Sequence, residues 1–244
     1  MLSNLKNAAK RYIPRGVYQP ALNWLRFHRP IAWGSFHTLT PVGNNFSGSF
    51  REIVDRYYIE SFLSEHRDDI RGNVLEVEDA FYAHKFGGAQ VAKIDVLYHG
   101  AGHPGATIIA DLAKAENIPA HSFDCIVLTQ VLQYIYDIKS ALAHIHRILK
   151  PGGVVLATVP GISYISRENA KRWGEYWHYT SFSARRLFEE HFPPDRLSVN
   201  ARGNVMVATA YLHSLRTRHL KKWQLDFTDP DFEVVITIRA AKPL

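Results

Sequence analysis

Two neighbouring stretches of sequence decide the fold: SFDCIVLTQVLQYIYD at residues 122–137 and HRILKPGGVVLATVP at residues 146–160. The first contains a continuous apolar run, which predicts a strand covered on both faces. From Asp137 to Leu149 the apolar residues recur at helical spacing, and Asp137 can cap that helix. The Pro-Gly-Gly at 151–153 ends the helix, and a second apolar run follows it. This order of elements predicts a parallel βαβ unit.

The same alternation continues on both sides of this unit. Apolar, β-branched runs predict further strands, and two other segments have helical periodicity. The predicted strands are 74–77, 92–98, 107–112, 197–212 and 232–240, and the predicted helices are 54–67 and 182–192. We therefore predict an α/β fold with a doubly wound, mostly parallel sheet.

Composition limits the classes of protein that this chain can represent. Apolar residues make up 46% of the 244 residues, which is enough for a sizeable buried core. No apolar run approaches the roughly 20 residues that cross a bilayer, and Lys6, Lys10 and Arg11 interrupt any signal-peptide core. Cys125 is the single cysteine, so an intrachain disulfide is impossible. We therefore expect a cytoplasmic protein.

The first 50 residues differ from the rest of the chain. They contain six Lys or Arg and no Asp or Glu, whereas the remainder has 23 basic and 23 acidic residues. Aromatic residues and prolines are interspersed among the charges. We predict two parts: a basic, aromatic extension at 1–50 and a main domain at 51–244. The extension either packs over the domain, which its many aromatics favour, or makes a peripheral contact with phosphates or an anionic surface.

The 122–137 and 146–160 stretches together resemble the class I S-adenosylmethionine-dependent methyltransferases. The first is similar to the family's fourth strand and the turn after it, and the second to its crossover into the fifth strand. The resemblance covers about residues 54–240, and it implies a Rossmann-like, seven-stranded sheet with an antiparallel last strand. A looser resemblance, carried by Asp55–Glu60, the TVPGIS turn and the Trp173/Trp177 pair, is to methyltransferase-like proteins associated with glycosyltransferases in polysaccharide biosynthesis.

The resemblance implies S-adenosylmethionine as cofactor and assigns residues to it. Glu76 would contact the methionine part of the cofactor, Asp95 the ribose hydroxyls and Asp111 the adenine, while Thr129 and Gln130 would line the pocket floor. The interval from Glu76 to Asp95 is 19 residues, near the roughly 20 that nucleotide-binding βαβ units use. Each acid alone is more typical of a solvated turn or a helix cap, but acids at successive strand ends together favour a ligand site.

The first loop departs from the family pattern of acid-x-Gly-x-Gly. Glu78 stands at the first glycine position and Ala80 at the second, and the nearest glycines are Gly87 and Gly88. In one interpretation the loop is rebuilt, with Glu78 or Asp79 facing the positive groups of the cofactor. In the other, the cofactor site has decayed. The short interval before the next strand also predicts a truncated first crossover.

A candidate base lies in the aromatic segment WGEYWHYT at 173–180. Methylation of a hydroxyl needs a group that removes its proton, and His178 or Glu175 could serve. Trp173, Tyr176 and Trp177 could form a platform for a sugar. Equally, His178 could bond a backbone carbonyl while the tryptophans pack on the sheet. The sequence has no Cys/His cluster with zinc spacing, so we predict no metal.

Three hypotheses about function follow. The first is a methyltransferase that acts on a hydroxyl group of a sugar or another small polar acceptor. The second is a catalytically inactive binding or scaffold partner of a glycosyltransferase. The third is a nucleic-acid or lipid-surface binder that uses the basic extension, although the main domain carries no nucleic-acid motif.

Overall fold

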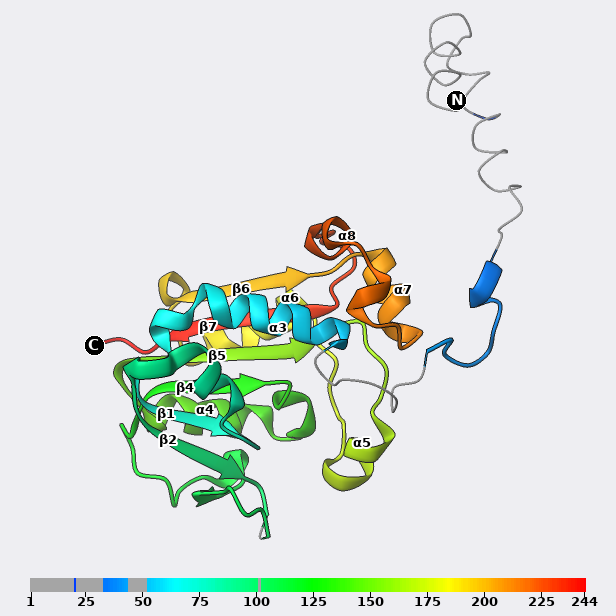
Figure 1. The fold of residues 1–244 in the computed structure, drawn as a ribbon. Helices are drawn as coiled ribbons and strands as arrows, with labels where there is room; N and C mark the ends of the chain where they lie inside the picture. Colours follow the sequence, from blue (N-terminus) through cyan, green and yellow to red (C-terminus); the bar gives the residue numbers. More distant parts are fainter. Residues whose placement is uncertain (1–19, 21–32, 44–51, 101) are drawn as a thin grey trace, which may run out of the picture. The chain divides into compact units, whose positions relative to one another are not determined.

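Figure 1 shows a computed structural model, which describes residues 20, 33–43, 52–100 and 102–244. The chain divides into two compact units, Met1–Leu39 and Thr40–Leu244. The described part of the first unit includes a 3-10 turn, η1 (Gly34–Phe36). Most of the predicted basic extension, and the predicted boundary after residue 50, lie outside the described residues.

The second unit contains a seven-stranded sheet in the order β3-β2-β1-β4-β5-β7-β6. The strands are β1 (Gly72–Val77), β2 (Val91–Tyr98), β3 (Ile108–Ile109), β4 (Phe123–Thr129), β5 (Leu149–Pro160), β6 (Leu197–Arg202) and β7 (Val235–Ala241). Strands β1 to β5 run parallel, whereas β7 is antiparallel to both β5 and β6. The predicted Rossmann-like sheet with an antiparallel last strand is confirmed.

Helices cover both faces of this sheet (Figure 1). They are α3 (Val54–Glu65), α4 (Ile138–Ile148), α5 (Arg167–Trp173), α6 (Ser181–Glu189), α7 (Val205–Leu212) and α8 (Lys222–Asp226). Short 3-10 or π turns are η3 (Arg67–Asp69), η4 (Ala83–Gly87), η5 (Gly88–Gln90), η6 (Leu112–Lys114), η7 (Leu132–Tyr134), η8 (Pro194–Arg196) and η9 (Thr217–His219). As predicted, the Asp137 carboxylate caps α4, accepting the Ser140 N–H at 3.1 Å.

The central strands are buried on both faces, as their continuous apolar sequences predict. In β4, Ile126 packs in one hydrophobic cluster with residues of α4 and α6. The preceding residue, Cys125, and the following one, Val127, point to the opposite cluster, which contains residues of α3 and η4. Cys125 is a free, buried thiol in that second cluster. The sheet is therefore held between two apolar layers.

Two strand predictions need correction. The segment 197–212 is half strand and half helix: β6 ends at Arg202, Gly203 adopts a φ of +124°, and the Asn204 side chain caps α7 by accepting the Val207 N–H. The apolar, β-branched run after Asn204 does not by itself distinguish a strand from a buried helix. The strand predicted at 107–112 is reduced to the two residues of β3, because Asp111 caps η6.

The first crossover, between β1 and β2, is truncated as predicted. It consists of the π turn η4 and the 3-10 turn η5, where the crossover between β4 and β5 has the full helix α4. The connection between β6 and β7 is long instead, and it carries α7 and α8. Residues of α3, α7 and α8 form a third apolar cluster. No helix in the described part of the chain is long and apolar enough to cross a membrane.

Candidate functional site

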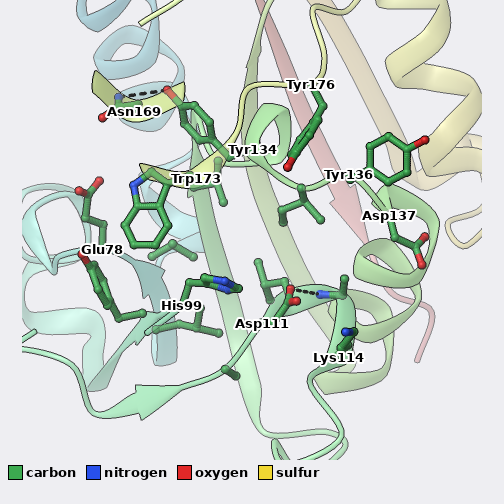
Figure 2. A pocket seen from close by; sticks show the side chains of 18 of the residues that line it. Glu78, His99, Asp111, Lys114, Tyr134, Tyr136, Asp137, Asn169, Trp173 and Tyr176 are labelled. Carbon is green, nitrogen blue, oxygen red and sulfur yellow. Dashed lines mark hydrogen bonds between the residues drawn. The ribbon is translucent and has the colours of Figure 1, made fainter. Parts of the chain in front are cut away.

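A cavity of about 400 Å³ opens where β1, β2, β3 and β4 end (Figure 2). Its lining comes from the four strand ends, the turns after them and the α5 segment: Val77, Glu78, Leu97, Tyr98, His99, Ala110, Asp111, Leu112, Ala113, Lys114, Gln130, Val131, Tyr134, Ile135, Tyr136, Asp137, Asn169, Trp173 and Tyr176. The carboxyl ends of parallel strands are where open α/β sheets bind ligands, and this volume lies in the range of small-molecule sites. Of the predicted site residues, the cavity brings together Glu78, Asp111 and Gln130.

Glu78 has the backbone conformation that a glycine would adopt most easily. Its φ is +79°, in the left-handed region, and its N–H donates to the Leu97 carbonyl at 3.0 Å. A residue with a Cβ is strained there, typically by about 1 kcal/mol. The loop after β1 therefore starts with a left-handed turn although its sequence lacks the glycine, and Glu78 lines the cavity.

The Glu76 carboxylate bonds to its own chain. It is buried in β1 and accepts the N–H of Tyr82 at 3.0 Å and of Ala83 at 2.7 Å, at the start of η4. Burial raises the pKa of the Glu76 carboxyl to about 7, and the two N–H donors partly offset this effect. Glu76 does not line the cavity. Asp79 also lies outside it, accepting the Phe81 N–H at 2.9 Å.

Asp95 lies in the middle of β2 and not at its end. Its carboxylate accepts the Lys93 ammonium at 2.8 Å and the Thr107 hydroxyl at 2.9 Å, and it does not line the cavity. The residues at the cavity end of β2 are Tyr98 and His99. The interval of about 20 residues thus points to a residue three positions before the end of β2, although the predicted strand at 92–98 already ended at Tyr98. Gly100, directly after His99, is the sequence signal for that end.

Asp111 follows β3 and Gln130 follows β4, the two strands that flank the β1–β2 pair. Asp111 lines the cavity and caps η6 by accepting the Ala113 N–H at 2.9 Å. Gln130 also lines it, with a φ of +56°. The Gln130 side-chain nitrogen is buried without a hydrogen-bond partner among the described residues. Thr129 pairs with Thr158 inside the sheet and does not reach the cavity.

Two residues of α5, Asn169 and Trp173, line the cavity, and Trp173 lies next to the end of β2. The Arg172 guanidinium donates to the Tyr98 hydroxyl and lies over the Trp173 ring, 4.6 Å from its centroid. Trp173 in turn meets Tyr98 and His99 edge-on, with centroid separations of 5.6 and 5.8 Å. Figure 2 shows Trp173 beside His99, and Asn169 donating to the Tyr134 hydroxyl at 3.2 Å. The sequence placed Trp173 in an acceptor platform, but its contacts are with the end of β2.

Three aromatic rings form an exposed rim at the β4 side of the cavity. Tyr136 is 71% exposed, meets Tyr176 edge-on at 5.3 Å and stacks with Trp177 at 6.1 Å. The Trp177 indole donates to the Ile135 carbonyl at 3.0 Å, which fixes its ring. Tyr136 and Tyr176 line the cavity, and Trp177 adjoins them. We call these three residues the aromatic rim.

Glu175 and His178 pair with each other next to the rim. The His178 Nε2 lies 3.4 Å from one Glu175 oxygen, and the other Glu175 oxygen accepts the Ser166 N–H at 3.0 Å. The Glu175 side chain is only 5% exposed, whereas that of His178 is 35% exposed. Neither residue lines the cavity. In the described part of the chain, no group of three His, Cys, Asp or Glu side chains is arranged to hold a metal ion.

Comparison with known proteins identifies the family. A family model described as "Methyltransferase domain" matches residues 72–199, just over half of the chain. The chain belongs to this methyltransferase family. The matched segment begins at β1 and ends within β6, so the cavity residues of this methyltransferase domain lie inside it and α7 and α8 lie outside it. A search of curated proteins finds no match.

Solved structures share the fold of this methyltransferase domain at low sequence identity. Phosphoethanolamine N-methyltransferase 2 of Haemonchus contortus, solved with S-adenosyl-L-methionine, is 15% identical with a TM-score of 0.50, over 82% of this chain and 61% of the other. The same enzyme with phosphomonomethylethanolamine and S-adenosylhomocysteine is 14% identical with a TM-score of 0.51, over 87% of this chain and 56% of the other. The [4+2]-cyclase SpnF is 13% identical with a TM-score of 0.51, over 85% of this chain and 88% of the other. The chain thus spans about three fifths of the Haemonchus enzyme.

Proposed function

We propose that the protein is an S-adenosylmethionine-dependent methyltransferase that methylates a hydroxyl group of a sugar or another small polar acceptor. Membership of the methyltransferase family supports the reaction class. The observation that carries the proposal is the left-handed backbone of Glu78 beside a ligand-sized cavity at the strand ends. A strained residue at such a place is typical of a functional site.

The residues of the cavity fit the cofactor. Asp111 and Gln130 offer polar groups from two strand ends, and the buried Gln130 side-chain nitrogen has no hydrogen-bond partner among the described residues. At the end of β2, Tyr98 and His99 take the place of the family's acid, so the ribose would be held by different groups than in relatives. When bound, the cofactor supplies a methyl carbon activated by a sulfonium.

Glu78 contributes charge as well as loop geometry. Its carboxylate is attracted to the positive sulfonium and amino groups and repelled by the cofactor's own carboxylate. Because Glu78 is exposed, solvent screens both interactions. We propose that Glu78 faces the positive groups, so that it favours the positively charged cofactor over the neutral thioether product.

The aromatic rim is the proposed acceptor platform. Its rings offer apolar faces next to the cavity, and Asp137, also part of the lining, offers a carboxylate for hydroxyl groups. A sugar has both features: an apolar ring face and a polar edge. The rim supports a sugar or a molecule of similar shape as the acceptor.

His178 with Glu175 is the proposed base for an acceptor bound at the rim. A carboxylate next to an imidazole orients the ring and stabilises its protonated form, as a base requires. The pair adjoins Trp177 in sequence and lies outside the cavity lining, so it would act on an acceptor that extends from the cavity over the rim.

Cofactor binding is tested by calorimetry with S-adenosylmethionine and S-adenosylhomocysteine. We expect saturable heat with both, and Glu78→Gln should weaken binding of the sulfonium form more than that of the thioether product. Asp68→Asn, at an exposed acid outside the cavity, is the matched control and should leave both affinities unchanged. Absence of heat and of any thermal shift at millimolar cofactor would remove the enzymatic proposal.

The base is tested with His178→Ala and Glu175→Gln in a methyl-transfer assay on sugars. We expect His178→Ala to lower turnover about a hundredfold with little change in cofactor affinity. His84→Ala, at an exposed histidine outside the cavity, controls for loss of a surface imidazole. Turnover near that of the wild type would assign proton removal to another group.

A second candidate is a catalytically inactive binding partner of a glycosyltransferase. Two observations favour it: a glutamate stands where the family has its first glycine, and the Glu76 carboxylate is already occupied by the chain's own amides. A protein described as a cyclase has the same fold, so the fold alone does not determine methyl transfer. Saturable sugar binding without cofactor binding would favour this candidate over the enzyme.

A further inference from the structure

The end of β2 presents the imidazole of His99 to the cavity. Its neighbour Tyr98 also lines the cavity, but Tyr98 is buried and its hydroxyl already accepts a hydrogen bond from the Arg172 guanidinium. His99 is exposed, and neither of its ring nitrogens has a hydrogen-bond partner among the described residues. His99 is therefore the side chain at this strand end that can bind a polar group of a ligand.

The acid of β2 does not take this place. Asp95 lies three residues before the strand ends, and it does not line the cavity. Its carboxylate is already engaged, because it accepts the Lys93 ammonium at 2.8 Å and the Thr107 hydroxyl at 2.9 Å. The end of β2 thus offers an imidazole, where a carboxylate would accept hydrogen bonds from both neighbouring hydroxyls of a ribose.

Contacts from α5 hold the His99 ring. Trp173 meets it edge-on with centroids 5.8 Å apart, and the Arg172 guanidinium covers Trp173 at 4.6 Å from the centroid of its ring. Figure 2 shows the imidazole extending from the end of β2 into the cavity, between Trp173 and Asp111. These contacts use the faces and edges of the rings, so the imidazole keeps its place while its nitrogens stay without a hydrogen bond.

An imidazole and a carboxylate recognise a ribose in different ways. The two oxygens of a carboxylate lie side by side and can accept from both hydroxyls of the ribose diol. The two nitrogens of an imidazole point to different sides of the ring, and in the neutral ring one donates and the other accepts. One nitrogen can face a given ligand, and it pairs with one hydroxyl. A ribose that His99 binds is therefore bound at a single hydroxyl.

Two carboxylates line the same cavity and are the rival partners for the ribose. Asp111 follows β3, and one of its oxygens accepts the Ala113 N–H at 2.9 Å, so only the other oxygen remains for a ligand. Glu78 follows β1, and in the proposed function its carboxylate faces the positive groups of the cofactor. Each carboxylate therefore has another partner, whereas the His99 imidazole has none among the described residues.

We propose that His99 binds one ribose hydroxyl of S-adenosylmethionine, so that the cavity tolerates adenosyl ligands altered at the neighbouring hydroxyl. The inference rests on the proposed function, because it takes this cofactor as the ligand of the cavity. It adds a rule of specificity. A cavity with an acid at the end of β2 loses affinity when either hydroxyl is removed, whereas this cavity loses affinity when one particular hydroxyl is removed.

Calorimetry of the full chain with S-adenosylhomocysteine and its 2′-deoxy and 3′-deoxy forms tests the proposal. We expect one deoxy form to bind as S-adenosylhomocysteine does and the other about three- to tenfold more weakly, the effect of one neutral hydrogen bond. His99→Ala should bind all three ligands equally. His99→Asp should bind both deoxy forms more weakly than S-adenosylhomocysteine, because a carboxylate pairs with both hydroxyls. His84→Ala, at an exposed histidine outside the cavity, should keep the wild-type pattern.

The wild-type pattern is decisive without any variant. Equal affinity for the three ligands, or weaker binding of both deoxy forms, would overturn the proposal. So would a difference that persists in His99→Ala and disappears in Asp111→Asn or Glu78→Gln, because a carboxylate would then hold the ribose. These results leave the proposed function intact, since S-adenosylhomocysteine still binds. Absence of any binding by the wild type would instead remove the proposed function and this inference together.

Discussion

The two crossovers on either side of the sheet centre have opposite characters. Between β4 and β5 the chain forms the full, capped helix α4, whose apolar face is completely buried. Between β1 and β2 it forms only the turns η4 and η5, with a left-handed glutamate and a buried carboxylate. The β4–β5 crossover contributes mainly to stability. The β1–β2 crossover follows Glu78, which lines the cavity, and we propose that its unusual residues influence what the cavity binds.

Leu142→Ala should break the regular crossover. Leu142 is fully buried in α4, so its truncation leaves a cavity and should lower the free energy of unfolding by about 3 to 4 kcal/mol. Denaturant titration measures the loss. Cofactor affinity, measured by calorimetry at a temperature where the variant is folded, should not change. A large loss of affinity would mean that α4 also shapes the ligand site.

Glu76 should give the irregular crossover a pH dependence. Its raised carboxyl pKa, about 7, means that the folded state holds the proton more tightly than the unfolded chain does. The stabilisation is therefore present below the ordinary pKa, near 4.5, and is lost as the pH rises through about 7. Relative to Glu76→Gln, the wild type should lose up to about 3 kcal/mol between pH 4 and pH 8, values chosen roughly to bracket the two pKa values. Parallel stability curves would contradict this.

Glu78→Gly tests the separate effects of backbone strain and side-chain charge at residue 78, at the start of the same crossover. Glycine adopts a φ of +79° without penalty, so the variant should be more stable by about 1 kcal/mol. It also loses the carboxylate, so its preference for the sulfonium form of the cofactor should disappear. Glu78→Gln keeps the strain and removes the charge. If both variants have wild-type stability, the backbone at this position is not strained.

Arg172→Gln should give the smallest effect. It removes the guanidinium that bonds Tyr98 and covers Trp173, at a cost of about 1 kcal/mol for a partly buried contact. Hydrogen exchange should become several-fold faster in α5 and remain unchanged in α4. Arg167→Gln, at the other end of α5, is a suitable control. Equal exchange in Arg172→Gln and the wild type would show that this contact does not hold α5.

The regular part of the molecule could be predicted from sequence because its signals are periodic. The run at 123–128, the spacing through α4 and the Pro-Gly-Gly turn each have one structural interpretation. The helix α7 was missed because Val205–Leu212 is apolar on nearly every side, and the break lies in two residues, Gly203 and Asn204. There the outward apolar face conceals the helical period.

The candidate site was less predictable for a different reason. Gln130 and Glu78 line the cavity because they directly follow the ends of β4 and β1, which the sequence marks clearly, whereas Asp111 was predicted inside the strand 107–112 and instead follows the shorter β3. Asp95 does not, because it lies three residues before the end of β2, and the interval that singled it out takes no account of where the predicted strand at 92–98 ends. The Arg172–Tyr98 contact joins residues 74 positions apart, and no local pattern indicates it.

The outer strands of the sheet have a consequence for solubility. At one edge, β3 offers only two residues for pairing with another chain. At the other, β6 is six residues long, presents Ser198 and Asn200 to solvent and packs against α6. Short or polar borders disfavour the edge-to-edge addition that leads to aggregation. The protein should therefore stay dispersed at concentrations where a sheet with a long apolar border would form fibrils.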